Sequence, residues 1–173
     1  MGTVCKTPVQ GPLGWTRRGC GGGNVLVAGF PAGTFQANCY VLAPGPDRAC
    51  VIVDPGEDAG RPLDRVIAEH GLTPAAILAT HGHPDHVHAA ADTARAYAVP
   101  VWIRAEDRRL LSRPWLGLSD ELAAGLGDRP WTEPNTVREL GADGEPEPVL
   151  ELAGLRIEAL HTPGHTAGST VFR

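Results

Sequence analysis

Apolar residues in the first part of the chain occur in short runs separated by turn-forming residues. Residues 24–30, 38–43 and 49–54 are apolar runs, and the last two are rich in β-branched and aromatic side chains, which is typical of strands. The sequence PGPDR lies between 38–43 and 49–54, so these two runs are expected to form a hairpin. Pro62 fits the first turn of a following helix, which Gly71 can end.

The middle of the chain alternates between strand and helix patterns. Residues 75–80, AAILAT, form an apolar run that predicts a strand buried on both faces. An alanine-rich segment at 88–98 predicts a helix, residues 99–105 predict the next strand, and residues 106–112 predict a short helix. This order of strands and helices indicates a layered α/β fold with at least one mixed sheet.

The last third of the chain is less regular. Residues 113–148 contain several prolines and glycines and two tryptophans without a strong period, so short helices and loops are expected there. Residues 149–160 alternate between apolar and polar positions around Ala153-Gly154, as a tight hairpin does. Residues 161–169 are expected to form a loop, and another strand is expected to open at Ser169.

Composition and charge indicate an ordinary globular protein. The chain has 173 residues, of which 42% are hydrophobic and 20% charged, enough for one domain with an apolar core. We expect residues 24–173 to form that domain, and residues 1–23, which are rich in Gly, Pro and Thr, to form a flexible N-terminal extension. The net charge of −5 and the lack of a Lys/Arg cluster argue against nucleic acid or an anionic membrane as a partner.

The sequence also suggests where the protein resides. No apolar run approaches the ~20 residues that a membrane-spanning helix needs, and the N-terminal residues lack the basic-then-apolar order of a signal peptide. A cytoplasmic location is therefore expected. Cys39 and Cys50 lie in apolar, strand-like runs, so we expect them to be buried free thiols.

Six of the seven histidines lie in two short segments about eighty residues apart. Residues 79–88 read ATHGHPDHVH, and residues 161–165 read HTPGH. The first segment directly follows the predicted buried strand, so His81 to His86 are expected on a loop at the strand end, where α/β folds collect ligands and catalytic groups. His161 is expected to be structural, and His88 to lie exposed on the first turn of the next helix.

The types and spacing of these residues favour a metal site. Imidazole and carboxylate are natural donors for zinc or iron. Several of them converging on one place would repel one another, or need costly desolvation, unless a cation lay between them. A catalytic zinc site keeps three protein ligands and one open position. His81, His83 and His165 make such a set, and Asp85 and His86 remain for a second metal.

The two segments resemble the motifs of the metallo-β-lactamase superfamily, and most of all its hydroxyacylglutathione hydrolase (glyoxalase II) branch. The sequence THGHPDH at residues 80–86 is similar to the family's THxHxDH motif, and HTPGHT at residues 161–166 matches its HTPGHT motif. Weaker matches are NCY at 38–40 and VDPG at 53–56. The resemblance covers residues 24–173 and implies an αββα sandwich with metals at the edge between its two sheets.

The resemblance also implies roles for individual residues. The implied metal ligands are His81, His83 and His165 on a first metal, and Asp85 and His86 on a second. Asp85 would also be catalytic, because it would orient the nucleophile and help to move its proton. Asp54 would brace the metal loop through hydrogen bonds, with Thr80 and Thr166 in similar supporting positions. One or two zinc ions are expected, with iron or manganese as alternatives.

The implied function is that of a metal-dependent hydrolase acting on a small-molecule thioester, similar to hydroxyacylglutathione hydrolase. In the family a metal-bound hydroxide attacks a carbonyl carbon, because the metal lowers the pKa of water from ~15.7 to ~7. Alternatives on the same fold are a lactonase, a β-lactamase or an iron-dependent persulfide dioxygenase.

One departure from the family leaves a further alternative. The family continues past the strand at 169–173 with a bridging Asp, a final His and further strands and helices. We therefore expect a sandwich that is incomplete at the C-terminus, and the further alternative is an inactive truncated fragment.

Overall fold

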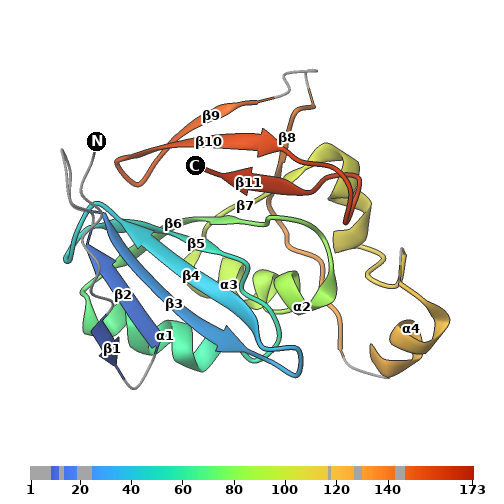
Figure 1. The fold of residues 1–173 in the computed structure, drawn as a ribbon, viewed down its shortest axis with the longest axis horizontal. Helices are drawn as coiled ribbons and strands as arrows, with labels where there is room; N and C mark the ends of the chain where they lie inside the picture. Colours follow the sequence, from blue (N-terminus) through green and yellow to red (C-terminus); the bar gives the residue numbers. More distant parts are fainter. Residues whose placement is uncertain (1–8, 12–13, 19–24, 117, 127–129, 143–146) are drawn as a thin grey trace.

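The computed structural model describes residues 9–11, 14–18, 25–116, 118–126, 130–142 and 147–173. These residues form two sheets, with helices over the outer face of the larger one (Figure 1). In order, the large sheet contains β1 (Val9–Gly11), β2 (Gly14–Arg18), β3 (Leu26–Ala32), β4 (Ala37–Ala43), β5 (Ala49–Val53), β6 (Thr73–Leu78), β7 (Val101–Arg104) and β8 (Val137–Leu140). The small sheet, in the order β11-β10-β9, contains β9 (Val149–Leu152), β10 (Leu155–His161) and β11 (Thr170–Phe172). The helices are α1 (Gly60–Glu69), α2 (Pro84–Val87), α3 (Ala90–Tyr97), α4 (Asp120–Leu126) and the 3-10 helix η1 (Ala105–Leu111).

Strand direction gathers several chain segments at one edge of the large sheet. β4 pairs antiparallel with β3 and β5, whereas β5, β6, β7 and β8 run parallel. α1 connects β5 to β6, and α3 lies between β6 and β7. The carboxyl ends of β5, β6 and β7 therefore lie at the same edge, which is where ligands bind in sheets of this kind.

The central strands are buried on both faces, which is why their sequences are almost continuously apolar. Ile52 of β5 and Ile77 of β6 pack in one core cluster with Leu63 of α1. Leu78 of β6 packs in a second cluster with Ile157 of the small sheet. Each such side chain contributes roughly 1.5–3 kcal/mol when it is buried, so the two cores hold the helices and the small sheet against opposite faces of the large sheet.

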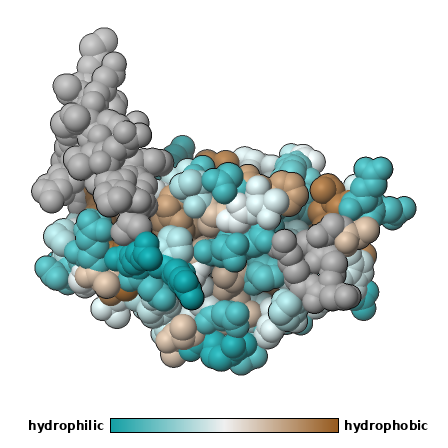
Figure 2. All heavy atoms as spheres, turned by 90° about the horizontal axis from the view of Figure 1, so that it is seen from below, coloured by the Kyte–Doolittle hydropathy of each residue, from teal (hydrophilic) through white to brown (hydrophobic). Residues whose placement is uncertain are grey.

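On the helical side of the molecule, the helix α1 is amphipathic. α1 buries Leu63, Val66 and Ile67 and leaves its charged residues toward solvent. Figure 2 views the molecule from this side and shows mostly hydrophilic and intermediate residues, with hydrophobic ones scattered among them. In the described part of the chain, no helix covers the outer face of the small sheet, where Val149 and Val171 are exposed (Figure 1). None of the described helices has the length and hydropathy to cross a membrane.

The N-terminal segment differs from the expected flexible extension. Within residues 1–23, β2 pairs antiparallel with β3, from Trp15 opposite Gly29 to Arg18 opposite Leu26, and β1 pairs with β2. The prediction does not hold for these two strands, because β2 pairs with an edge of β3 that would otherwise be unpaired, and β1 then pairs with β2. The rest of the predicted extension lies outside the described residues.

Two elements in the remainder of the chain also differ from prediction. β8 lies in the segment 113–148, where no strand was predicted, because only Leu140 of its sequence VREL is buried and no apolar alternation appears. α2 begins at Pro84, so Asp85 and His86 lie on a short helix and not on the connecting loop. Proline is favoured at that first helical position. The predicted hairpin at 149–160 is confirmed as β9 and β10, and the layered α/β class is confirmed.

The predicted buried thiols are confirmed. Cys39 of β4 and Cys50 of β5 are free and fully buried. Burial raises the pKa of the Cys50 thiol to about 12, so this thiol stays protonated and behaves as a small apolar side chain. Cys5 and Cys20 lie outside the described residues.

Candidate metal centre

The two histidine segments lie at the same end of the molecule although they are distant in the sequence (Figure 1). His81 and His83 follow β6 of the large sheet, and His165 lies on the loop between β10 and β11 of the small sheet. A backbone hydrogen bond joins the two supports, because the Thr170 N–H donates to the carbonyl oxygen of Thr80 over 2.8 Å. Each sheet thus carries one part of the site.

His81, His83 and His165 converge on one point. One ligand atom from each lies within 4.8 Å of the other two. Nδ1 of His83 is 3.0 Å from Nε2 of His165. The ring centre of His81 is 4.9 Å from that of His83 and 4.8 Å from that of His165. The structure therefore brings together the three residues that the sequence grouped for a first metal.

Hydrogen bonds behind the ring fix the orientation of His81. The Thr80 hydroxyl donates to Asp54 Oδ2 over 2.6 Å, so Thr80 Oγ1 accepts from Nδ1 of His81, which is 3.0 Å away. With its proton on Nδ1, His81 presents the lone pair of Nε2. This Nε2 is buried and has no hydrogen-bond partner among the described residues. A buried polar atom without a partner is costly, and a cation at this point would satisfy it.

The electrostatics of the cluster favour the neutral imidazoles of His81 and His83. Burial, and then the nearby His86, His83 and His165, lower the pKa of His81 to about 3. Burial and His165 also lower the pKa of His83, against the opposing charges of Asp85 and Asp107. Neutral imidazole is the form that binds metals. The side chains present therefore fit a divalent metal ion.

Asp85 and His86 lie on α2 beside this three-histidine cluster. The ring centre of His86 is 4.2 Å from that of His81, and its Nε2 is 3.4 Å from Asp85 Oδ2. Nδ1 of His86 donates to Asp54 Oδ2 over 2.9 Å. Burial alone would lower the pKa of His86, but the hydrogen bond to Asp54 and the charges of Asp54 and Asp85 raise it overall. The pair is therefore next to the cluster, where it could contribute to a second metal position.

Asp54, at the end of β5, supports the residue before His81 and the ring of His86. The residue is buried, and its φ of 51° turns the chain immediately after the strand. Its Oδ1 accepts from the Thr80 N–H over 2.7 Å. A Cβ added at Gly56 would lie 1.8 Å from the carbonyl oxygen of Asp85, so this segment packs directly against α2. These contacts support the predicted bracing role of Asp54.

Two residues of the site were not predicted from the sequence. Asp107 of η1 is 1% exposed and accepts hydrogen bonds from the N–H groups of Gly82 (3.1 Å) and Gly168 (2.8 Å) and from the Thr166 hydroxyl (2.6 Å). Ser169 Oγ lies 2.8 Å from Thr166 Oγ1 and accepts from the Thr166 N–H over 3.0 Å. The signal for Asp107 was its position just after β7, at the same carboxyl edge as the end of β6.

The other two clustered histidines have separate roles. Nε2 of His161 donates to the carbonyl oxygen of Ala167 over 2.8 Å, so this ring holds the loop that carries His165, in keeping with the structural role expected of it. His88 is not exposed as predicted. It is half-buried between α2 and α3, and its ring centre lies 5.7 Å from that of Trp131, because the segment 130–136 folds back over this part of the molecule.

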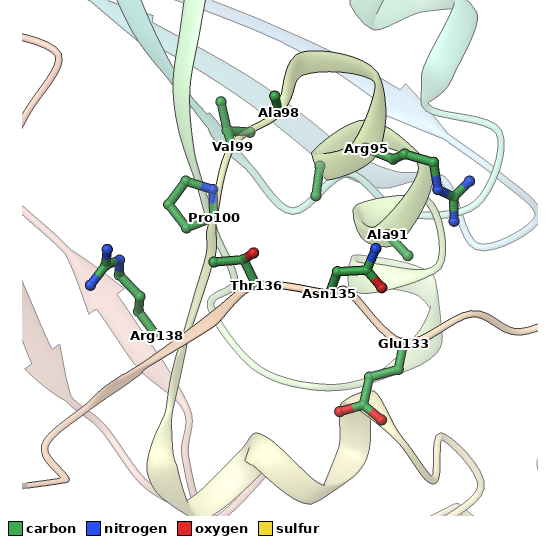
Figure 3. A pocket seen from close by; sticks show the side chains of 10 residues that line it. Ala91, Arg95, Ala98, Val99, Pro100, Glu133, Asn135, Thr136 and Arg138 are labelled. Carbon is green, nitrogen blue, oxygen red and sulfur yellow. The ribbon is translucent and has the colours of Figure 1, made fainter.

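A separate pocket of about 320 Å³ lies between α3 and the segment before β8 (Figure 3). Small apolar residues of α3 and of the turn that follows it form part of its wall, and none of its lining residues belongs to the histidine centre. Two of its charged groups are paired, since Arg95 contacts Asp92 at 2.8 Å and Glu133 contacts Arg108. The third, Arg138, lies over the ring of Trp102, with Cζ 5.5 Å from the ring centre. The pocket is therefore separate from the histidine centre.

Comparison with known proteins gives a consistent family. The profile described as Metallo-beta-lactamase superfamily matches residues 32–173. An uncharacterized protein of Mycobacterium tuberculosis is 42% identical over 149 residues, which are 86% of this chain and 65% of that protein. Hydroxyacylglutathione hydrolase GloC of Haemophilus influenzae is 35% identical over 149 residues, which are 83% of this chain and 63% of that protein. The chain thus spans somewhat less than two thirds of the length of these relatives.

Solved structures show the same architecture. The B3 metallo-beta-lactamase BLEG-1 matches with a TM-score of 0.68 and 32% identity, over 84% of this chain and 66% of that chain. TTHA1623, solved in a di-iron-bound form, matches with a TM-score of 0.61 and 29% identity, over 84% of this chain and 65% of that chain. The family match includes both histidine segments. The chain therefore belongs to the metallo-beta-lactamase superfamily.

Proposed function

We propose that this chain is a metal-dependent hydrolase that cleaves a small-molecule thioester to a carboxylic acid and a thiol. The observation that carries the proposal is the convergence of His81, His83 and His165, in which the buried Nε2 of His81 has no partner among the described residues. A divalent metal held by these side chains would supply Lewis acidity, which acidifies water and polarises a carbonyl group. Zinc is the proposed ion, because zinc commonly takes three imidazole ligands and keeps an open position. Iron and manganese are the alternatives.

Asp85 is the proposed proton-transfer group. Its carboxylate is partly exposed on α2, next to the three-histidine cluster and 3.4 Å from Nε2 of His86. An ionised carboxylate accepts hydrogen bonds through both oxygens, so Asp85 can orient a water molecule and take its proton as the water attacks the carbonyl carbon. The same carboxyl group can then give that proton to the sulfur of the departing thiolate.

The neighbouring residues of the chain act by orientation. Asp54 accepts hydrogen bonds from Thr80 and His86, which fixes the proton positions on the rings of His81 and His86. Such supporting hydrogen bonds tune metal ligands as well as placing them. Thr166, next to His165, is tied to Ser169 and Asp107, so the second histidine loop is also held from behind. We propose Asp54, Thr80 and Thr166 as the supporting residues of the centre.

The thioester substrate is proposed from the likeness to hydroxyacylglutathione hydrolase GloC. A β-lactam is the second candidate substrate, because BLEG-1 is a B3 metallo-beta-lactamase of the same fold. Oxidation of a persulfide at iron is a third candidate, and the di-iron-bound form of TTHA1623 supports only the choice of metal. The acidic balance of the chain, with a net charge of −5, supports a small-molecule partner over nucleic acid, and we propose a cytoplasmic location.

The proposal is tested by measuring metal per chain together with turnover. We expect about one zinc per chain, loss of that zinc in His83→Ala, and unchanged zinc in the control His70→Ala, whose side chain lies at the end of α1. We expect hydrolysis of a hydroxyacylglutathione thioester to exceed that of a lactone or a β-lactam. Unchanged metal in His83→Ala would refute the three-histidine site. Bound iron together with oxygen consumption on a persulfide would assign the chain as a dioxygenase and not as a hydrolase. Bound metal without any of these activities would refute the catalytic proposal.

A further inference from the structure

The 3-10 helix η1 lies directly beneath both segments that carry the three histidines. A Cβ added at Gly82 would lie 2.5 Å from Cβ of Leu110, and one added at Gly168 would lie 2.7 Å from Cγ of Asp107. Gly82 separates the two histidines that follow β6, and Gly168 lies on the loop between β10 and β11. Both loops therefore rest on the same short helix, at positions where only glycine allows so close an approach.

Asp107 is the residue at which the two loops meet. Its Oδ2 accepts from the Gly82 N–H over 3.1 Å and from the Thr166 hydroxyl over 2.6 Å, and its Oδ1 accepts from the Gly168 N–H over 2.8 Å. A buried charge is tolerated only when it is well hydrogen-bonded, and these donors satisfy both oxygens of a side chain that is 1% exposed. The donors lie 25, 59 and 61 positions away in the sequence, so the contact forms only in the folded chain.

We propose that Asp107 is a positioning residue that clasps the His81–His83 loop to the His165 loop and thereby holds the three imidazoles at metal-binding separation. The inference rests on the proposed function, because it takes these three histidines as the metal ligands. Its role differs from that of Asp54, whose side-chain hydrogen bonds among the described residues go to Thr80 and His86 on the large-sheet side. Asp107 is the carboxylate that joins the loop of one sheet to the loop of the other.

The chemistry of the clasp predicts which substitutions weaken it. Asp107→Asn keeps the shape but offers only one acceptor oxygen to three donors, and its amide N–H groups would face N–H and O–H donors. Asp107→Ala removes every acceptor. Thr166→Val removes one of the three hydrogen bonds and leaves the carboxylate in place. Loss of a residue that supports metal ligands typically weakens metal binding 10–100-fold, and we expect losses of this size for both Asp107 variants and a smaller loss for Thr166→Val.

The test uses zinc affinity, measured by competition with a chromophoric chelator, and the visible spectrum of the cobalt(II)-substituted chain. Asp107→Asn should bind zinc 10–100-fold more weakly and show altered cobalt bands, because the ligand geometry has relaxed. Asp92→Asn, in an exposed pair with Arg95, is the control for the same chemical change and should match the wild type. Leu63→Ala, in the core under α1, should lower thermal stability while leaving the cobalt spectrum unchanged, which separates positioning from general destabilisation.

A metal-free measurement keeps the proposed function and the clasp distinguishable. In the metal-free chain, amide hydrogen exchange at Gly82 and Gly168 should be faster in Asp107→Asn than in the wild type. Wild-type zinc affinity and an unaltered cobalt spectrum in Asp107→Asn would overturn the clasp and leave the proposed function standing. A wild-type chain that binds no zinc would refute the metal site. Faster exchange at both glycines in Asp107→Asn would then still support the clasp, and unchanged exchange would overturn it.

Discussion

Asp54 and His86 meet through a 2.9 Å hydrogen bond although 32 positions separate them in the sequence. The same oxygen, Asp54 Oδ2, also accepts the hydroxyl of Thr80 over 2.6 Å, and Thr80 in turn accepts from Nδ1 of His81. One carboxylate therefore places the proton on two rings, directly on His86 and through Thr80 on His81. Among the described residues this leaves Nε2 of His81 without a hydrogen-bond partner, whereas Nε2 of His86 lies 3.4 Å from Asp85 Oδ2.

Replacing Asp54 by asparagine should weaken metal binding without unfolding the chain. The amide oxygen cannot accept from the Thr80 N–H, the Thr80 hydroxyl and His86 together, so the ring protons of His81 and His86 lose their fixed positions. We expect zinc affinity to fall roughly 10–100-fold, measured by chelator competition. Asp58→Asn is the matched control, because Asp58 is exposed in the same loop. Equal affinity in the two variants would contradict the bracing role of Asp54.

Gly56→Ala should damage both stability and the site. A Cβ at this position would lie 1.8 Å from the carbonyl oxygen of Asp85, so α2 must move away from the segment that follows β5. Overpacking of this kind commonly destabilises by about 1–3 kcal/mol, which urea unfolding would detect. Gly60→Ala is the control, since a Cβ there meets nothing within 4 Å and alanine favours the helix. A Gly56→Ala chain as stable as the control would show that this close packing is not required.

The metal-free chain should lose stability as the pH falls below about 6.5. Burial and the neighbouring imidazoles lower the pKa of His81 to about 3, so the unfolded chain binds a proton between about pH 6.5 and 3 that the folded chain does not. Stability therefore rises with pH through this window and is lost on acidification, by at most about 1.4 kcal/mol per pH unit for one such group. His86, whose pKa is raised, acts in the opposite sense and loses its contribution as the pH rises.

The comparison of unfolding free energies between pH 7 and 5 isolates the effect of His81. His81→Asn should show a shallower dependence on pH than the wild type in the absence of metal, whatever its own stability at pH 7. His70→Asn should follow the wild-type slope, because His70 lies away from the cluster at the end of α1. Parallel curves for the wild type and His81→Asn would refute the assigned protonation behaviour.

Zinc should stabilise the folded chain, and a chelator should remove that stabilisation. A ligand that binds only the folded state adds about 2.7 kcal/mol at a free concentration of 100 times its Kd. Thermal unfolding with zinc, and again after addition of EDTA, measures this difference. His165→Ala should show little or no response to zinc, whereas His88→Ala, outside the three-histidine cluster, should keep most of it. A wild-type response equal to that of His165→Ala would argue against binding at this centre.

The sequence predicted the parts of the fold that follow from short-range pattern. β5 and β6 were visible because Ile52, Ile77 and Leu78 belong to apolar runs buried on both faces, and the hairpin around Ala153-Gly154 was visible because its strands alternate. β8 was missed because an edge strand with one buried residue, Leu140, has no such pattern. Pairing of β2 with the edge of β3 was missed because it depends on a partner and not on local composition.

The sequence predicted those residues of the candidate site whose side chains are typical metal ligands and lie close together within two short segments of the sequence. The HxHxDH and HTPGH segments grouped His81, His83 and His165, and the structure brings these side chains together because the loop after β6 and the loop between β10 and β11 meet. Asp107 was hidden in EDRRLLS, a sequence like that of any charged short helix. Its three hydrogen-bond donors lie 25 to 61 positions away in the sequence. A local sequence pattern cannot predict such contacts.

The three histidines are divided between two sheets. The distances between their rings therefore depend on the thickness of the apolar layer between those sheets. His81 and His83 follow β6, and His165 lies on the loop that connects β10 to β11. Ala76 and Ala159 are fully buried in that layer, where a larger side chain would push the sheets apart and carry the imidazoles with them. The size of ion that the proposed centre would accept thus depends partly on alanines that are not among its three histidines.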